Sequence, residues 1–255
     1  MSNELTVLYE DADIAAVDKP SGLMAHSDGR SEGPFLTDWI TGRFPGAVGV
    51  GEPARSHEGK AIDRSGIVHR LDRETSGVIL VAKTQAGFDC LKGQFQDRTV
   101  AKRYLAFIWG KLDEEFGTID RPIGRSANDF PKWSAQRGTR GEIRNAETYW
   151  TRLWTGETKV DENAERPEKF TLVEAEPKTG RTHQIRVHFL AIHHPIVSDT
   201  LYAPKRPHAL GFTRTALHSR SIEFMNTEGK RVKVEAPLPA DFQAAIRKLG
   251  ITLIS

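Results

Sequence analysis

The chain has 255 residues, of which 38% are hydrophobic and 27% charged, a balance typical of a globular domain rather than a disordered chain. Its net charge of +2 falls short of the strongly basic footprint that would by itself indicate nucleic-acid binding, and its one cysteine excludes an internal disulfide and a cysteine-built zinc site. The sequence opens without a secretory signal and has no apolar run of ~20 residues, so we expect a cytoplasmic protein that does not enter a membrane.

The first part of the chain predicts two short strands and a helix. Thr6–Glu10 and Ile14–Lys19 have strand composition, are joined by a polar turn, and are followed by Pro20-Ser21-Gly22. Phe35–Phe44 has apolar residues at helical spacing and ends at a proline. Residues 46–65 show no periodicity, and we expect a mobile surface loop long enough to contact a substrate.

The most informative stretch is Gly66–Lys83, where a polar turn of alternating charge precedes an apolar run that predicts a buried strand. Asp72 lies between Arg70 and Arg73, and Thr75-Ser76-Gly77 suits a turn with local hydrogen bonds. Neighbouring cations favour the ionised form of a carboxyl group, which can then act as nucleophile or base. On charge and spacing alone, a surface aspartate that caps a helix or pairs with arginine is the other interpretation.

The rest of the chain predicts alternating helices and strands. A charged excursion at residues 156–169, between two paired strands, predicts a variable hairpin tip. The expected elements are an amphipathic helix at Gln85–Phe95, a strand at Thr99–Trp109, paired strands at Ala146–Leu153 and Phe170–Glu176, a helix ending at Ile192, a hairpin of Ser221–Met225 with Lys230–Ala236, and a closing helix at Asp241–Leu249.

Basic residues recur in two parts of the sequence with few compensating acids. Each group taken singly is most simply a solvated face, but together they would track a phosphate backbone with strong salt dependence. The groups are Arg98, Lys102 and Arg103, and then Arg121, Arg125, Lys132, Arg137, Arg140 and Arg144.

Five stretches of the chain contain specific sequence motifs. They are Asp18–Leu23, His69-Arg70-Leu71-Asp72 with the turn and strand that end at Lys83, Lys102–Ala106, Gly180–Arg186 and Thr215–Ser219. Together they resemble the RluA-type pseudouridine synthases, which isomerise uridine in RNA. The resemblance runs from about Leu8 to Leu238, and it implies an α+β pseudouridine synthase catalytic fold over a single domain, residues 1–255. That fold has a bent, largely antiparallel mixed sheet in two lobes, flanking helices and a central cleft.

The resemblance also implies roles for single residues. Asp72 takes the position of the catalytic aspartate, and Arg186 that of the basic residue paired with it. Tyr104 would lie against the target base and Leu217 would pack under it. The family commonly has a glycine where Ser198 stands, a departure that concerns a local turn.

A uridine inside folded RNA must leave its stack, and a side chain beside the cleft can fill the gap. Arg70 is our candidate for this wedge, with His69 helping to shape the site. The resemblance implies neither a metal nor an organic cofactor. It implies RNA as the partner, either ribosomal or transfer RNA, and a sequence that begins directly in the catalytic domain without an RNA-binding domain before it. We expect a monomer because no exposed heptad or apolar stripe stands out.

Two other function classes have some support in the sequence. Nine histidines invite a metal-hydrolase interpretation. However, His183 and His188 are five residues apart and would point about 140° apart on a helix, so satisfied polar or capping histidines are the better interpretation. A catalytically idle RNA-binding or ribosome-assembly protein on the same fold is the second alternative. The presence of Asp72, Tyr104 and Arg186 in the resembling motifs speaks against it.

Overall fold

The structure is a computed structural model. It describes residues 4–253 with gaps at 28–32, 53, 56–58, 60, 63, 128–131, 137–138 and 161–163. The chain divides into two compact units. The first comprises residues 1–102 and 219–237, and the second residues 103–218 and 238–255. Within the described part, no helix is long and apolar enough to cross a membrane.

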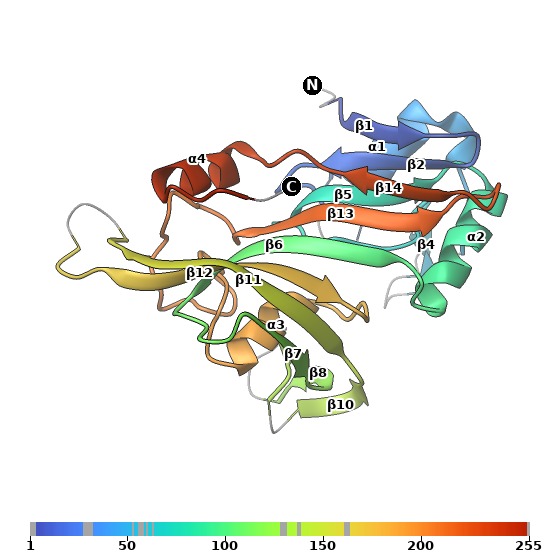
Figure 1. Cartoon of the computed structure of the whole chain (residues 1–255). Coiled ribbons are helices and arrows are strands. Elements are labelled where there is room, and N and C mark those ends of the chain that lie inside the picture. The colour runs from blue at the N-terminus through green and yellow to red at the C-terminus, as the bar shows by residue number, and fades with distance from the viewer. Residues whose placement is uncertain are drawn as a thin grey trace. The chain divides into compact units, whose positions relative to one another are not determined.

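The first unit is built on a sheet in the order β1-β2-β5-β13, with β14 pairing β13 (Figure 1). The pairs β1/β2, β2/β5 and β13/β14 are antiparallel. The strands are β1 (Thr6–Glu10), β2 (Ile14–Lys19), β5 (Ser76–Ala82), β13 (Leu217–Met225) and β14 (Arg231–Glu235). Two helices, α1 (Leu36–Arg43) and α2 (Gln85–Gln96), complete the unit together with a 3-10 turn (Pro45–Ala47) and the short pair β3 (Ala54–Arg55) and β4 (Ala61–Ile62).

The strand that follows Asp72 is buried along its whole length, and after Ser76 and Gly77 its sequence is an uninterrupted apolar run. Val78 and Leu80 of β5 join Ile14 and Phe224 in one core cluster, to which α2 contributes Leu91. The start of α2 is capped by the Thr84 hydroxyl, which accepts a 3.1 Å hydrogen bond from the Gly87 amide. This core fixes the strand that the Asp72 turn leads into.

The second unit has a sheet in the order β6-β12-β11-β7, in which neighbouring strands are antiparallel. The strands are β6 (Ala101–Trp109), β7 (Phe116–Asp120), β11 (Glu147–Thr158) and β12 (Glu168–Pro177). A separate three-stranded sheet has the order β10-β8-β9 and comprises β8 (Ile123–Ser126), β9 (Trp133–Ser134) and β10 (Thr139–Arg144). The helices are α3 (Gln184–Ala191) and α4 (Ala240–Lys248).

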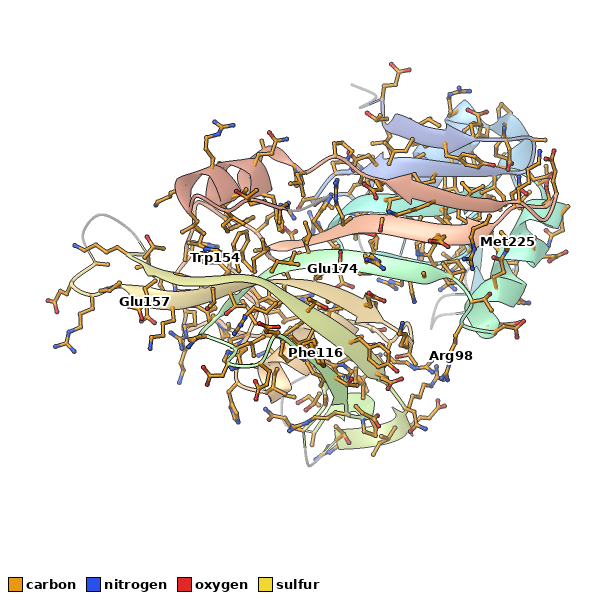
Figure 2. The ribbon with its side chains drawn as sticks, in the orientation of Figure 1. Arg98, Phe116, Trp154, Glu157, Glu174 and Met225 are labelled. Carbon is orange, nitrogen blue, oxygen red and sulfur yellow. The ribbon has the colours of Figure 1, made fainter. Side chains whose placement is uncertain are left out.

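Most long apolar elements lie where the sequence predicts them. β1 and β2 have the predicted bounds, α1, α2, β5, α4 and the β13/β14 hairpin are confirmed within four residues at their ends, and α3 ends one residue before the predicted Ile192. The strands β11 and β12 extend into the segment predicted as a hairpin tip, as the positions of Trp154 and Glu157 on β11 show in Figure 2. A Cβ on Gly156 would lie 2.4 Å from the Trp154 ring, so the indole covers the strand there and favours its continuation.

Two stretches differ from the prediction. Residues 46–65 were predicted as a loop, but they include part of the 3-10 turn and the β3/β4 pair. Nothing in the sequence pattern predicted the strands β7 to β10. β10 is exposed at nearly every position, so it lacks the alternation of apolar and polar residues that identifies a half-buried strand.

Candidate active site

The Asp72 turn lies in the first unit, directly before β5. Asp72 is partly buried, and its backbone carbonyl accepts a 3.1 Å hydrogen bond from the Thr75 amide, which closes a tight turn. β5 begins at Ser76, so the carboxyl group lies four residues before a fully buried strand. The predicted arrangement of a carboxylate at the start of a core strand is present.

The turn is held by the stretch that follows β2. Lys19 is fully buried, and its ammonium group donates to the Arg73 carbonyl at 3.2 Å and to two carbonyl groups of its own turn at 2.8 and 2.9 Å. The Ser21 hydroxyl donates to the Glu74 carbonyl at 2.9 Å. Gly22 exchanges two hydrogen bonds with Arg73, at 2.8 Å and 3.1 Å. These contacts fix the backbone on the C-terminal side of Asp72.

The segment before the turn lies along an edge of β5. The Ala82 amide donates to the Gly66 carbonyl at 2.8 Å. Two residues earlier on the strand, the Leu80 amide donates to Nε2 of His69, also at 2.8 Å. A side chain therefore takes the place of a backbone carbonyl in the ladder. Gly66 has φ +73°, and a Cβ there would lie 2.5 Å from the Ala82 carbonyl oxygen, so this approach requires glycine.

His69 is held in its neutral form. Because Nε2 accepts the Leu80 hydrogen bond, that nitrogen carries no proton, and the ring stacks on Phe95 with centroids 4.7 Å apart. Burial, with a smaller repulsion from the Lys102 ammonium, lowers the pKa of His69 from 6.5 to about 3. The ring is partly exposed to solvent, but the hydrogen bond alone already favours the neutral form. This assigns His69 to supporting the turn rather than to proton transfer near neutral pH.

The depressed pKa of His69 predicts a specific acid sensitivity. The stability that comes from neutral His69 is fully present above about pH 6.5 and is lost as pH falls toward about 3, because only the unfolded chain binds the proton. The free energy of unfolding should fall by about 1.4 kcal/mol per pH unit from this group. Urea unfolding between these pH values gives the free energy of unfolding as a function of pH. The slope of this plot should be smaller in His69→Gln by the amount that corresponds to one proton, whereas the exposed control His208→Gln should match the wild type. Equal slopes in all three proteins would contradict the assignment.

Arg70 is exposed beside the turn, as a wedge into RNA would have to be. Its role as the wedge stays a prediction.

Arg186 lies on α3 of the second unit and forms a bidentate ion pair with Asp199. Nε lies 2.7 Å from Oδ2 and Nη2 lies 2.8 Å from Oδ1, and the two side chains are 8% and 0% exposed. Asp199 also accepts the backbone amides of Leu201 and Tyr202, at 3.1 and 3.0 Å. The carboxylate is thus saturated with donors, as a buried charge requires. The pair uses Nε and Nη2 of the guanidinium, which fixes the orientation of the side chain.

Tyr202 supports the same guanidinium from one face. Its ring centroid lies 4.9 Å from Cζ of Arg186. The Tyr202 hydroxyl lies 2.7 Å from Nδ1 of His183 and accepts a 3.1 Å hydrogen bond from the Trp133 amide. Stacking on a planar cation and anchoring of the ring's far end together hold Arg186 in one conformation.

Asp199, the partner of Arg186, was not among the residues predicted from the sequence. The sequence feature that could have indicated Asp199 is the stretch His194–Asp199, in which Ser198 stands where the family commonly has glycine. Ser198 has φ +58°, the left-handed conformation that glycine adopts without strain. Its hydroxyl donates to the Phe212 carbonyl at 2.9 Å, which supports the turn with a contact that glycine lacks. Ser198 therefore preserves the turn conformation that orients Asp199 toward Arg186.

Tyr104 and Leu217 are both buried in the second unit. Tyr104 lies on β6 opposite Ala175 of β12. Leu217 begins β13, and its carbonyl accepts a 3.2 Å hydrogen bond from Arg214, which is itself paired with Asp241 at 2.7 Å. Both side chains are thus in rigid surroundings. Their contact with a base stays a prediction.

The six predicted site residues therefore fall into two groups. His69, Arg70 and Asp72 lie on one turn of the first unit, and Tyr104, Arg186 and Leu217 lie in the second. The pairing of Arg186 with Asp72 stays a prediction.

Two histidines near the α3 helix, His188 and His194, have ordinary polar partners. His188 is fully buried between the Thr148 hydroxyl at 2.9 Å and the Arg121 carbonyl at 3.0 Å, and burial lowers its pKa. His194 lies 2.9 Å from the Trp109 carbonyl. As the sequence analysis expected, these are satisfied polar histidines. Among the residues that the structure describes, no three His, Cys, Asp or Glu side chains are grouped to hold a metal ion.

Comparison with known proteins gives a consistent result. Residues 13–191 match the family model described as RNA pseudouridylate synthase. An uncharacterized RNA pseudouridine synthase of Mycobacterium bovis is 38% identical over 248 residues, which cover 96% of this chain and 73% of the relative. Ribosomal large subunit pseudouridine synthase D of Xanthomonas campestris is 35% identical over 257 residues, which cover 96% of this chain and 69% of the relative.

Solved structures agree with the sequence relatives. Human RNA pseudouridylate synthase domain containing 1 has a TM-score of 0.68 and 26% identity, and the match covers 92% of this chain and 84% of the human one. Human RNA pseudouridylate synthase domain containing 4, at 22% identity and a TM-score of 0.70 over 98% of this chain and 94% of its own, shares the fold. Because the family model covers most of the chain and relatives match nearly all of it, the chain belongs to the RNA pseudouridylate synthase family.

Proposed function

We propose that this enzyme converts specific uridines of a folded RNA to pseudouridine, with Asp72 as its essential carboxylate. The observation that carries the assignment is the Asp72 turn, which three separate side chains hold against the core. Lys19 and Ser21 bond the two backbone carbonyls that follow Asp72 within the turn, and the His69 ring, before the turn, bonds β5. A turn fixed from both sides presents its carboxyl group in one place, as catalysis requires. We further propose a cytoplasmic monomer that needs no cofactor.

The reaction is an isomerisation that consumes nothing. The bond from N1 of uracil to C1′ of the ribose breaks, the base rotates, and a bond from C5 to C1′ forms. The proton on C5 is lost and N1 gains one. Asp72 would attack the sugar or the base, or remove a proton at the 2′ position, and all three routes need the ionised carboxylate.

The second unit would supply the groups that surround the base. Arg186, oriented by Asp199 through Nε and Nη2, would pair with Asp72 and keep it ionised. Tyr104 would cover one face of the uracil and Leu217 the other, because base stacking on an aromatic ring is worth about 1–3 kcal/mol. Arg70, exposed beside the turn, would fill the gap that the extruded uridine leaves.

Ribosomal RNA is our first candidate substrate, because a relative that shares 35% identity is named for the large ribosomal subunit. Transfer RNA is the other.

The test is tritium release from RNA labelled at C5 of uracil, prepared from cells that lack this protein. The wild type should release tritium to water in proportion to the uridines converted, and RNA labelled at C6 should release none. Mapping the modified positions would then name the RNA. Salt-sensitive RNA binding without release would overturn the proposal in favour of an idle RNA-binding protein on this fold.

A further inference from the structure

At β11, the sheet of the second unit has one face against α3 and one face exposed to solvent. Thr148 and Trp150 are buried, and Nδ1 of His188 on α3 lies 2.9 Å from the Thr148 hydroxyl. Successive side chains of a strand point to opposite faces, so Tyr149 and Thr151 lie on the other face, where both are exposed. This exposed face is accessible to another molecule.

Two aromatic side chains lie close together on the exposed face. Phe116 of β7, labelled in Figure 2, is 74% exposed and lies directly opposite Thr151. Tyr149, two residues before Thr151, is 40% exposed. Diagonal neighbours on paired strands are about 7–8 Å apart, within reach of aromatic side chains. We call Phe116 and Tyr149 the aromatic patch. Contact of a phenylalanine ring with water is unfavourable, so a partner that covers Phe116 would gain binding free energy from its burial.

Acidic residues outnumber basic ones around the aromatic patch. Residues 111–120 and 147–153, all of them described, contain the acids Asp113, Glu114, Glu115, Asp120 and Glu147 and the bases Lys111 and Arg152. Asp120 and Glu147 lie directly opposite each other on β7 and β11, and like charges in this position destabilise a sheet. The charge of Glu147 raises the pKa of the Tyr149 hydroxyl, and burial, a hydrogen bond to Glu147 and the charge of Asp120 add to this shift. The electrostatic potential at the patch is therefore negative.

The two bases near the patch have other partners within the chain. Lys111 pairs with Asp113 at 3.2 Å, and Arg152 donates to two backbone carbonyls of the same loop, at 2.7 and 2.8 Å. Among the residues that the structure describes, no ion pair includes Asp120 or Glu147. These two carboxylates are thus available to cations of another molecule.

The chain itself shows how this face holds a cation. The Lys178 ammonium group lies 4.6 Å from the centroid of the Tyr149 ring and 3.4 Å from Oε2 of Glu176. A cation over an aromatic ring and beside a carboxylate is attracted by both. Lysine or arginine side chains of a partner would find the same chemistry at the neighbouring carboxylates.

The negative charge favours a basic protein over the other possible occupants. RNA bases could stack on the two rings, but the carboxylates of Asp120 and Glu147 would repel the phosphates. A second copy of the chain would bring the same carboxylates together, and like charges that meet across an interface oppose binding. A protein that combines an apolar side chain with lysine or arginine matches both parts of this face.

We propose that the aromatic patch, together with Asp120 and Glu147, is a docking surface for a basic protein. Phe116 and Asp120 are four residues apart on β7, a distance of about 13 Å, and Tyr149 lies between them on the neighbouring strand. The partner would place an apolar side chain over Phe116 and its basic side chains at the two carboxylates. Because this face is opposite α3, the docked partner would leave uncovered the helix that carries Arg186.

The experiment introduces the photoreactive amino acid p-benzoylphenylalanine at position 116 of the full chain, in cells of its own organism. Irradiation should join position 116 to a protein, and mass spectrometry should show that the joined segment has a net positive charge. The matched control is position 225, where Met225 is 37% exposed in the first unit, and this position should not give that adduct. Adducts only with RNA, only with a second copy of the chain, equally at both positions or at neither would overturn the proposal.

Charge reversal tests the chemistry with the purified partner that the adduct identifies. Asp120→Lys/Glu147→Lys should weaken the affinity for this partner by at least about tenfold, and Phe116→Ala by about tenfold. The reversed pair keeps like charges opposite each other, so the stability should stay near that of the wild type. The control Asp97→Lys/Glu228→Lys reverses two exposed acids of the first unit and should keep the wild-type affinity. Equal affinities of the two reversed proteins would contradict the proposal.

Tritium release separates docking from catalysis. Purified Phe116→Ala should release tritium from free RNA at the wild-type rate, because the surface lies opposite α3. Loss of release in this variant would place Phe116 in the reaction and overturn the docking role. A wild type that releases no tritium but forms the protein adduct would remove the isomerase proposal and leave the docking surface standing.

Discussion

Asp72→Asn is expected to abolish tritium release from C5-labelled RNA, with a loss of at least about 10³-fold in kcat. Asparagine keeps the size of the side chain but lacks the charge that all three proposed routes need. The turn itself should survive, because the Thr75 hydrogen bond goes to the backbone carbonyl of residue 72 and the bonds from Lys19 and Ser21 go to carbonyls after it. Unfolding in urea should therefore occur close to the wild-type midpoint.

The control for Asp72→Asn is Asp97→Asn, an exposed carboxylate of the same unit, which should keep full activity. RNA affinity of the Asp72 variant should also stay near wild type, so that kcat falls while binding does not. Tritium release by Asp72→Asn at the wild-type rate would leave the enzyme in place and refute the assignment of its central residue.

The parts of the fold that the sequence predicted are those in which a local pattern coincides with burial. β5 was predictable because a short apolar run rich in β-branched residues and bounded by turns is typical of a strand covered on both faces. β10 was not, since it is polar and exposed and owes its place to pairing with β8. Of the predicted basic residues, Arg121 bonds the Ala191 carbonyl at 2.9 Å and so anchors α3, and Arg137 lies outside the described residues.

In the candidate site, too, the features that follow from local sequence were predictable and those that depend on distant contacts were not. The charge pattern around Asp72 is local, so the turn could be predicted from it. Lys19 was placed in a motif, but its burial under the turn was not predictable, because lysine is rarely buried unless partnered and one of its acceptors, the Arg73 carbonyl, lies 54 residues away in the sequence. Likewise, nothing in the spacing of His69 indicates that its ring replaces a carbonyl in the ladder of β5.

Asp199→Ala is expected to lower the free energy of unfolding by about 3–5 kcal/mol, because it leaves the Arg186 guanidinium buried without its bidentate partner. The amides of Leu201 and Tyr202 lose their acceptor in the same change. Urea unfolding measures the effect. The control is Glu223→Ala, which breaks the solvent-exposed ion pair with Arg231 and should cost about 1 kcal/mol or less. Equal costs in the two variants would mean that the Arg186–Asp199 pair is no stronger than a surface one.

A double variant separates the support of Arg186 from its chemistry. Arg186→Met/Asp199→Ala removes both buried charges, so it should regain a substantial part of the stability that Asp199→Ala loses. Tritium release should nevertheless stay at the level of Asp72→Asn, because the group proposed to hold Asp72 ionised is gone. Recovery of both stability and activity would show that Arg186 serves only to neutralise Asp199. Recovery of stability without recovery of activity would show that Arg186 takes part in the reaction and that Asp199 positions it.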